Sequence, residues 1–226
     1  KYVSFTSGIM RKKDIENQEH RYLNRSLWAN LQSLKSTVSF MQTGAHPDDE
    51  TSRLLAKLSL DEGYYVSYVN AVRGQGGQNS IGPERDDNLG ALRTYELLKA
   101  MSVLRVDIGW LANSRNNSIV DFGLSKSAEE TFEFWDKNYT IQRMIRMVRA
   151  YKPDIIIPTF LDVNGQHGHH RSVTRATIEA YDKSNDPEMF PDDNFSPWKI
   201  SQIFLPAWSG GGGSYDDEED PPKATH

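Results

Sequence analysis

Three consecutive isoleucines between two prolines constrain the fold of this chain more than any other feature. Residues Ile155–Ile157 are β-branched throughout, and Pro153 and Pro158 close the segment on both sides. The run therefore indicates a short β-strand with no polar face. Strands that are buried on both faces are typical of parallel sheets that carry helices on either side.

The rest of the chain alternates between strand and helix patterns around this segment. Further strands are expected where aromatic and β-branched residues gather, at residues 37–41, 64–69, 106–108 and 203–205. Helices are expected at residues 14–35, about 51–60, in a long segment after Pro83, and at 140–150 and 171–181. This alternation predicts an α/β fold, a Rossmann-like three-layer sandwich with a mostly parallel sheet.

Two of these helices predict which side chains reach the core. Apolar residues recur there at helical spacing, and the positions expected to face the core are Leu89, Leu92, Leu97, Ala100, Ile141, Met144, Ile145 and Val148.

Composition excludes several classes of protein. The 226 residues suffice for one substantial domain, and the net charge of −5 argues against a protein that binds the phosphate backbone of nucleic acids. No apolar run approaches the about 20 residues that a membrane span requires. The chain has no cysteine, which excludes disulfides, thiolate metal sites and cysteine nucleophiles. Any bound metal must therefore be held by histidine and carboxylate side chains.

Polar clusters follow three of the expected strands. They lie at residues 46–50, 73–79 and 162–170. Because ligands of open α/β sheets bind beyond the carboxyl ends of the strands, we expect the three clusters to meet at one edge of the sheet.

The first cluster, His46–Glu50, has two interpretations. Pro47 and the acids after it suit the first turn of a helix, which would make the histidine incidental. Alternatively, His46 and Asp49 are three residues apart and can face one point, while Asp48 between them points elsewhere. An imidazole and a carboxylate on a metal, with a second carboxylate beside it, are what a hydrolytic site requires.

The third cluster favours the metal site. Three of the six histidines lie between His167 and His170, although such a group can also bind metal adventitiously. His167 and His170 have the same spacing of three residues as the first pair. One of them would complete a three-ligand zinc site with an open position.

Several segments of the chain together resemble a known protein family. The segments that carry the resemblance are His46–Glu50 after a strand, the Gly74–Gly77 loop, Leu89–Glu96 and the His167-x-x-His170 pair, which together span about residues 37–182. In this order they resemble the PIG-L/LmbE-type N-acetylglucosaminyl deacetylases. The Gly74–Gly77 loop lacks the spacing and the Lys-Ser/Thr ending of a nucleotide-binding P-loop.

The resemblance implies a catalytic metal centre. His46, Asp49 and His170 are then the ligands of Zn²⁺ or another divalent metal. Asp48 is the general base that takes a proton from the attacking water, and His167 stabilises the oxyanion and helps the amine to leave. The reaction needs no covalent intermediate with the enzyme.

The resemblance also implies substrate contacts. Arg93 matches an arginine that contacts substrate in related enzymes, although it can also be a surface residue paired with Glu96. Arg73 follows a strand and is expected beside the site. Aromatic side chains that can stack on sugar rings, or simply pack, are Trp110, Trp208 and Tyr215.

One position departs from the family pattern. The family has an acid immediately before the last zinc histidine, and here that residue is His169. An acid there would orient a neighbouring histidine. Asp162 or another carboxylate is expected to replace it, unless the pH optimum shifts or His169 itself contributes to the metal site.

The function expected from the resemblance is a zinc-dependent hydrolase that removes the acetyl group from an N-acetylated amino sugar, an N-acetylglucosamine conjugate or oligomer. The alternatives are a zinc amidase for another N-acyl substrate and a non-catalytic carbohydrate-binding protein. We expect an N-terminal arm and helix (1–36), a catalytic domain (37–209) and a flexible Gly-rich, acidic tail (210–226). The first residue is lysine and the chain ends abruptly, so we expect a piece of a longer, exported protein.

Overall fold

The computed structural model of the protein describes residues 27–77, 79–112, 118–191 and 194–207. In chain order, its elements are α2 (Leu27–Gln32), β1 (Ser39–Gly44), α3 (Ser52–Ala56), the π-helical turn η1 (Lys57–Asp61), β2 (Tyr65–Asn70), α4 (Asp86–Leu104), β3 (Asp107–Trp110), α5 (Ala128–Trp135), α6 (Lys137–Tyr151), β4 (Ile155–Pro158), α7 (Gly168–Lys183) and β5 (Gln202–Ile203). In this part of the chain, no helix combines the length and the apolar character needed to cross a membrane.

The sheet has five parallel strands in the order β3-β2-β1-β4-β5. β1 lies in the middle, where Phe40 aligns with Val66 of β2 on one side and with Ile155 of β4 on the other. The isoleucine segment forms β4, and Ile156 at its centre is fully buried. The predicted α/β fold with a mostly parallel sheet is therefore confirmed.

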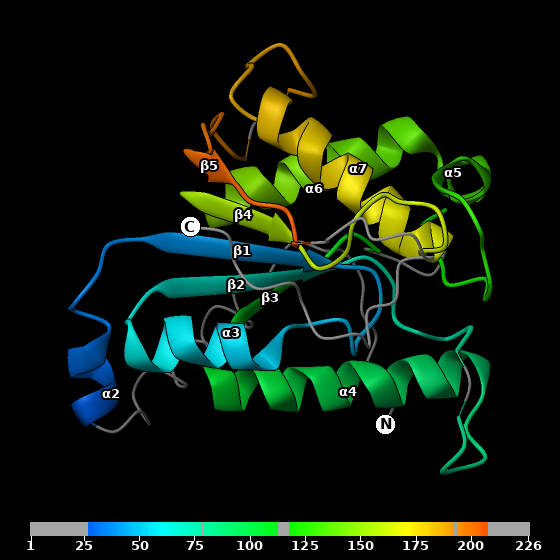
Figure 1. Ribbon diagram of the computed structural model, residues 1–226, viewed down its shortest axis with the longest axis horizontal. Helices are drawn as coiled ribbons and strands as arrows, with labels where there is room; N and C mark the ends of the chain where they lie inside the picture. Colours follow the sequence, from blue (N-terminus) through cyan, green and yellow to red (C-terminus); the bar gives the residue numbers. More distant parts are fainter. Residues whose placement is uncertain (1–26, 78, 113–117, 192–193, 208–226) are drawn as a thin grey trace.

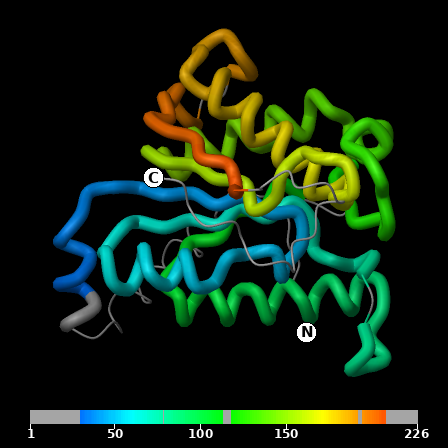
Figure 2. Tube along the Cα trace, viewed as in Figure 1, coloured from blue at the N-terminus to red at the C-terminus, as the bar shows by residue number. Residues whose placement is uncertain are grey.

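Helices cover both faces of this sheet (Figure 1). α3 and α4 lie against one face, and α5, α6 and α7 lie against the other. Side chains alternate along the strands, so Phe40 joins the core beneath α3 and α4 while its neighbour Met41 joins the core beneath α6 and α7. Figure 2 shows α2 at the end of the sheet where β1 begins, away from the carboxyl ends of the strands.

The helix patterns predicted the core well in α6 and less well in α4. In α6, all four expected positions are buried, namely Ile141, Met144, Ile145 and Val148. In α4, Leu89 and Leu97 are buried and Ala100 packs against the core. The prediction was wrong for Leu92, which is 37% exposed. The buried stripe of α4 runs through Thr94, Leu97 and Met101, and Leu92 lies on the opposite side of the helix.

Other boundaries differ from the sequence predictions. The first described helix covers only Leu27–Gln32, and the earlier part of the helix expected at 14–35 lies outside the described residues. Helix α5 was not predicted. It is a short helix whose first turn is capped by Ser127, which accepts a hydrogen bond from the backbone of Glu130. The tail expected at 210–226 also lies outside the described residues, so the proposed domain division stays a prediction.

The strand order places the reversal of the sheet at β1. The chain continues from β1 to β2 on one side, whereas β4 pairs with β1 on the other side. The loops that leave β1 and β4 therefore diverge, and a crevice at such a reversal is where open α/β sheets bind ligands. These loops contain the first and third polar clusters of the sequence.

Candidate metal centre

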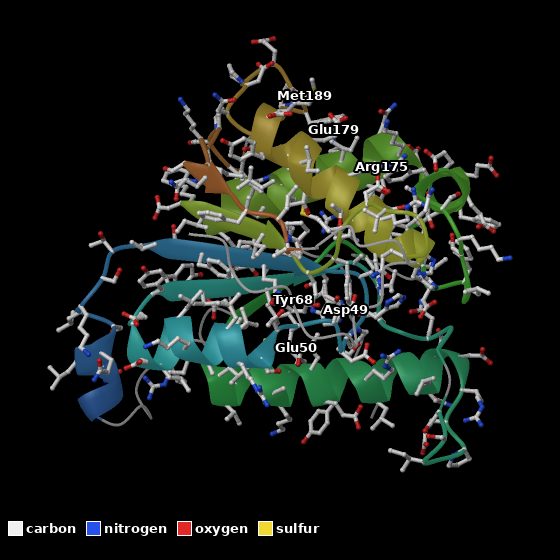
Figure 3. All side chains as sticks on the ribbon, in the orientation of Figure 1. Asp49, Glu50, Tyr68, Arg175, Glu179 and Met189 are labelled. Atoms are coloured by element: carbon white, nitrogen blue, oxygen red, sulfur yellow. The ribbon has the colours of Figure 1, made fainter. Side chains whose placement is uncertain are left out.

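Asp49 shapes the loop that follows β1. Its Oδ2 atom accepts hydrogen bonds from the backbone N–H groups of Ala45 and His46, both at 2.8 Å. A Cβ atom at Gly44 would collide with the Tyr68 hydroxyl, so the end of β1 requires glycine. The loop turns tightly and brings His46 beside Asp49, as their spacing predicted. Figure 3 shows Asp49 and Tyr68 at this end of the sheet.

Three side chains converge here to form a group that can hold a metal ion. His46 Nδ1 lies 3.0 Å from His170 Nε2 and 3.7 Å from Asp49 Oδ2, and His170 Nε2 lies 3.4 Å from Asp49 Oδ1. Ligands held 2.0–2.1 Å from one tetrahedral zinc ion are about 3.3 Å apart. The measured distances are close to this spacing, with the two histidines facing different oxygens of Asp49. The three residues are the ones expected from the sequence.

His170 is held by two neighbours. Its Nδ1 donates a hydrogen bond to Gln166 Oε1 at 2.7 Å, and its ring stacks on Phe160 with the centroids 4.1 Å apart. Because Nδ1 carries the proton in this arrangement, Nε2 offers its lone pair toward Asp49 and His46. Gln166 was not recognised in the sequence, although its place next to the histidine cluster is the one signal that marks it.

Asp49 carries the negative charge of the group. Burial alone would raise its pKa, but the charges and hydrogen bonds of His170 and His46 outweigh burial and lower the pKa far below its usual range. Asp49 is therefore ionised at neutral pH. One carboxylate and two imidazoles form a donor set that suits a catalytic zinc site, which takes three protein ligands and a fourth from water or substrate.

His167 lies at the start of α7, beside this group. Its ring nitrogens face the backbone N–H groups of His169 at 3.2 Å and Ser125 at 3.4 Å, and its ring centre lies 5.3 Å from that of His46. Burial, followed by the charges of His46 and His170, lowers the pKa of His167 to about 4. The free protein thus favours a neutral ring, and the predicted role of His167 remains a prediction.

His169 faces the opposite side of His46. Its Nδ1 atom lies 3.1 Å from His46 Nε2, and its ring is fully buried. Burial, with the charges of the neighbouring histidines, lowers the pKa of His169 to about 2. His46, His167 and His169 therefore form a second group of nitrogen atoms with metal-ligand spacing.

Asp48 is not one of the three grouped side chains and pairs instead with an arginine. Its Oδ1 atom forms an ion pair with Arg93 Nη2 at 2.6 Å, and its side chain is 71% exposed. Arg93 is thus paired with Asp48 in the folded chain, although Glu96 was the partner considered from the sequence. Arg93 comes from α4, so this contact joins the loop after β1 to that helix.

The Gly74–Gly77 loop packs around the guanidinium of Arg93. The Gly74 carbonyl accepts a hydrogen bond from Arg93 Nη1 at 3.3 Å, and a Cβ atom at Gly74 would collide with that nitrogen. A Cβ atom at Gly77 would lie 2.7 Å from the same Nη1 atom. The glycines of this loop therefore make room for an arginine side chain.

Arg73 contacts one of the aromatic residues proposed for sugar stacking. Its guanidinium carbon lies 3.5 Å from the centre of the Trp110 ring, and burial lowers its pKa to about 9. The ring face of Trp110 is thus used for a cation–π contact. The substrate role of Arg73 stays a prediction, and Trp208 and Tyr215 lie outside the described residues.

Asp162 does not replace the missing acid of the family pattern. Its Oδ1 atom accepts a hydrogen bond from Arg171 Nε at 2.6 Å, and its Oδ2 atom pairs with Arg175. The carboxylate nearest to His169 belongs to Asp121, whose Oδ1 lies 3.9 Å from His169 Nδ1. Asp162 therefore ties the loop after β4 to α7.

The ion pair of Asp162 predicts a pH-dependent loss of stability. Burial alone would raise the pKa of Asp162, but Arg175 and Arg171 outweigh it and lower the pKa. The carboxylate therefore stabilises the fold above its unfolded pKa of about 3.9, and this contribution is lost as the pH falls through the lower folded value. We expect Asp162→Asn to lower the free energy of unfolding by about 1–2 kcal/mol at pH 7.

Urea unfolding of both proteins between pH 7 and about pH 3 measures this effect. The difference between them should stay constant down to about pH 5 and shrink below it. A difference that grows toward acid pH would contradict the assignment.

Comparison with known proteins gives a consistent picture. A family model described as PIG-L: GlcNAc-PI de-N-acetylase matches residues 41–181. The 1D-myo-inositol 2-acetamido-2-deoxy-alpha-D-glucopyranoside deacetylase of Streptomyces scabiei is 29% identical over 177 residues, which cover 71% of this chain and 53% of that protein. The mycothiol S-conjugate amidase of Streptomyces coelicolor is 27% identical over 174 residues, 70% of this chain and 56% of that protein. The chain thus spans little more than half the length of these relatives.

Among solved structures, the N,N'-diacetylchitobiose deacetylase from Pyrococcus horikoshii superposes with a TM-score of 0.57 at 22% identity. The match covers 86% of this chain and 69% of that one. At this identity the likeness concerns the fold.

Proposed function

This chain belongs to the PIG-L family, and from that premise we propose that it is a zinc-dependent hydrolase that removes the acetyl group from an N-acetylated amino sugar. One observation carries the proposal. His46, Asp49 and His170 bring three donor atoms within metal-ligand spacing of one another, and the next carboxylate in the chain, Asp48, stands outside that group. Three ligands and a separate base are the minimum for metal-assisted hydrolysis.

The residues present divide the chemistry among them. A divalent metal such as Zn²⁺, when bound, supplies Lewis acidity and makes water more acidic. Asp48 accepts a proton as water attacks the acyl carbon, and His167 donates an N–H group toward the charge that develops on the acyl oxygen. The C–N bond then breaks, acetate leaves, and the amine takes up the proton that Asp48 accepted from the water. Arg93, beside Asp48, and Arg73 are assigned to contacts with the substrate.

The substrate class rests on the relatives. The matched deacetylases act, by their names, on a 2-acetamido-2-deoxy-glucopyranoside of myo-inositol. We therefore propose an N-acetylglucosamine conjugate or oligomer as the substrate of this chain.

A second candidate is an amidase that acts on a different N-acyl group. The similarity to a mycothiol S-conjugate amidase favours it, because that relative matches nearly the same share of this chain as the deacetylases do. Both candidates use the same metal centre and the same base. They differ only in the acyl group and the amine that the site accepts.

Acetate release from a panel of N-acetylglucosamine conjugates and oligomers tests the proposal. Zinc-loaded protein is expected to release acetate, and protein stripped with a chelator is expected to lose this activity until zinc returns. A parallel panel of amides with larger acyl groups identifies the amidase alternative. Tight sugar binding without hydrolysis of any panel member would instead indicate a carbohydrate-binding protein.

A further inference from the structure

His46 is the only expected zinc ligand whose second ring nitrogen faces another histidine among the described residues. Its Nδ1 atom belongs to the group formed with Asp49 and His170, so its Nε2 atom points away from them. That Nε2 atom lies 3.1 Å from Nδ1 of His169. A histidine that ligates through Nδ1 carries its proton on Nε2 and needs an acceptor there.

His169 is fixed firmly enough to serve as that acceptor. It is fully buried and stacks on Trp135, with ring centres 4.8 Å apart and the planes 24° from parallel. The edge of Phe122 packs on it at 4.5 Å. Trp135 is itself anchored, because its Nε1 donates a hydrogen bond to the carbonyl of Val120 at 2.7 Å. The aromatic neighbours therefore set the direction of His169 Nδ1.

The second nitrogen of His169 supports this assignment. If Nδ1 accepts the proton of His46, the proton of neutral His169 sits on Nε2. In the described part of the chain, this Nε2 atom is buried and has no hydrogen-bond partner. An orphaned buried polar atom in a folded protein needs an explanation. The need for an acceptor at Nδ1 explains the orphaned Nε2 atom, because this need fixes both the tautomer of His169 and the position of its ring.

No carboxylate takes this place among the residues described. In this part of the chain the carboxylate that pairs with His46 belongs to Asp49 and faces Nδ1 at 3.7 Å, whereas Asp121 Oδ1 lies 3.9 Å from His169 Nδ1 and accepts a hydrogen bond from the Gly123 backbone at 3.0 Å. Metal-ligating histidines usually donate to a carboxylate, a backbone carbonyl or water. In this chain the partner of His46 is an imidazole.

We propose that His169 is a positioning residue for the metal centre. It accepts the Nε2 proton of His46 and thereby holds Nδ1 of His46 toward the metal. The inference rests on the proposed function only in that the metal occupies the group of His46, Asp49 and His170. The first turn of α7 then serves both histidine ligands, because His170 contributes a donor atom and the adjacent His169 orients His46.

His169→Phe tests the proposal, because phenylalanine keeps the stacked ring and removes both nitrogens. In zinc-free buffer this variant is expected to unfold at about the same urea concentration as the parent, because the orphaned His169 Nε2 is removed while His46 Nε2 loses its acceptor. Its zinc affinity, measured by competition with a chromophoric chelator, is expected to fall by about 10–100-fold, as for the loss of an outer partner of a metal ligand. Substitution with Co²⁺ should give an altered visible spectrum.

Two further variants separate positioning from packing. His169→Asn offers an amide oxygen close to the position of Nδ1 and should recover zinc affinity to within about threefold of the parent. Phe134→Leu alters the same aromatic cluster through the 4.4 Å contact of Phe134 with Phe122. It leaves His169 and His46 in place, and the zinc affinity should stay within about twofold of the parent.

The outcomes distinguish the inference from the proposed function. If the parent protein binds zinc and His169→Phe binds it equally well, the inference is wrong and the proposed function stands. If the parent protein binds two zinc ions per chain and His169→Phe binds one, His169 is a ligand and the inference is also wrong. Failure of the parent to bind zinc would overturn the proposed function itself.

Discussion

Replacing His170 with phenylalanine is expected to lower zinc affinity, and with it deacetylation by the zinc-loaded protein, by at least about a thousandfold, beyond the 10–100-fold cost of losing an outer partner. Phenylalanine keeps the stacked contact with Phe160 but removes Nε2, one of the three donor atoms of the metal group. Two donors from His46 and Asp49 cannot hold zinc in a catalytic site, which normally has three protein ligands. Competition with a chelator and acetate release measure the two effects.

Stability in the presence of zinc provides a readout that is independent of activity. A ligand that binds only the folded state stabilises it by about 4 kcal/mol at a thousand times its dissociation constant. We expect the parent to gain this stability when zinc is added and His170→Phe to gain almost none. If the variant is stabilised by zinc as much as the parent, the metal binds elsewhere and His170 is not a ligand.

The sequence predicted the sheet because its strands are short, well separated and contain aromatic or β-branched residues, most clearly in β4. The isoleucine segment became the strand beside β1, and the parallel arrangement followed from its lack of a polar face. Helix α6 was equally clear, since Ile141, Met144, Ile145 and Val148 recur at helical spacing over about two turns. In β4 and α6 the hydrophobic pattern lies within a few consecutive residues, so both elements could be recognised from the sequence.

Elements that depend on tertiary contacts were predicted less well. Helix α5 has only eight residues, too few for a clear period, and it is stabilised by burial of Trp135 against the core beneath α6 and α7. Leu92 was expected in the core because it belongs to the apolar residues that recur at helical spacing in this segment. Leu92 is exposed because the other face of α4 packs on the sheet. Which face packs depends on the contacts of the helix layer formed by α3 and α4.

In the site, too, local spacing was predictable from the sequence and tertiary contacts were not. The spacing of His46 and Asp49 within one loop predicted their convergence, and the strand-end rule brought His170 to them across 124 residues. The pairing of Asp48 with Arg93 and of Asp162 with two arginines had no local signature. These contacts form only when α4 and α7 pack against the loops, so they became visible only in the folded chain.

Asp48→Asn is expected to lower kcat by about 10²–10⁴-fold, the usual contribution of a positioned general base. Asparagine has nearly the same shape but cannot take the proton of the attacking water. Zinc affinity should stay within about twofold of the parent, because Asp48 lies outside the group of metal ligands. Asp61→Asn is the matched control. It removes an exposed carboxylate paired with Lys57 at the end of η1, and activity should be unchanged.

The ion pair with Arg93 offers a competing explanation of the same loss, and a second variant separates the two. If Asp48 acts only by holding Arg93 for the substrate, Arg93→Gln will reproduce the whole loss of kcat. If Asp48 is the base, Arg93→Gln raises KM and leaves most of kcat, and the double variant combines a raised KM with the lowered kcat. A kcat of Asp48→Asn within about tenfold of the parent would exclude Asp48 as the base. The exposed position of this carboxylate suits the role, because a base beside the ligands must reach the substrate water without binding the metal itself.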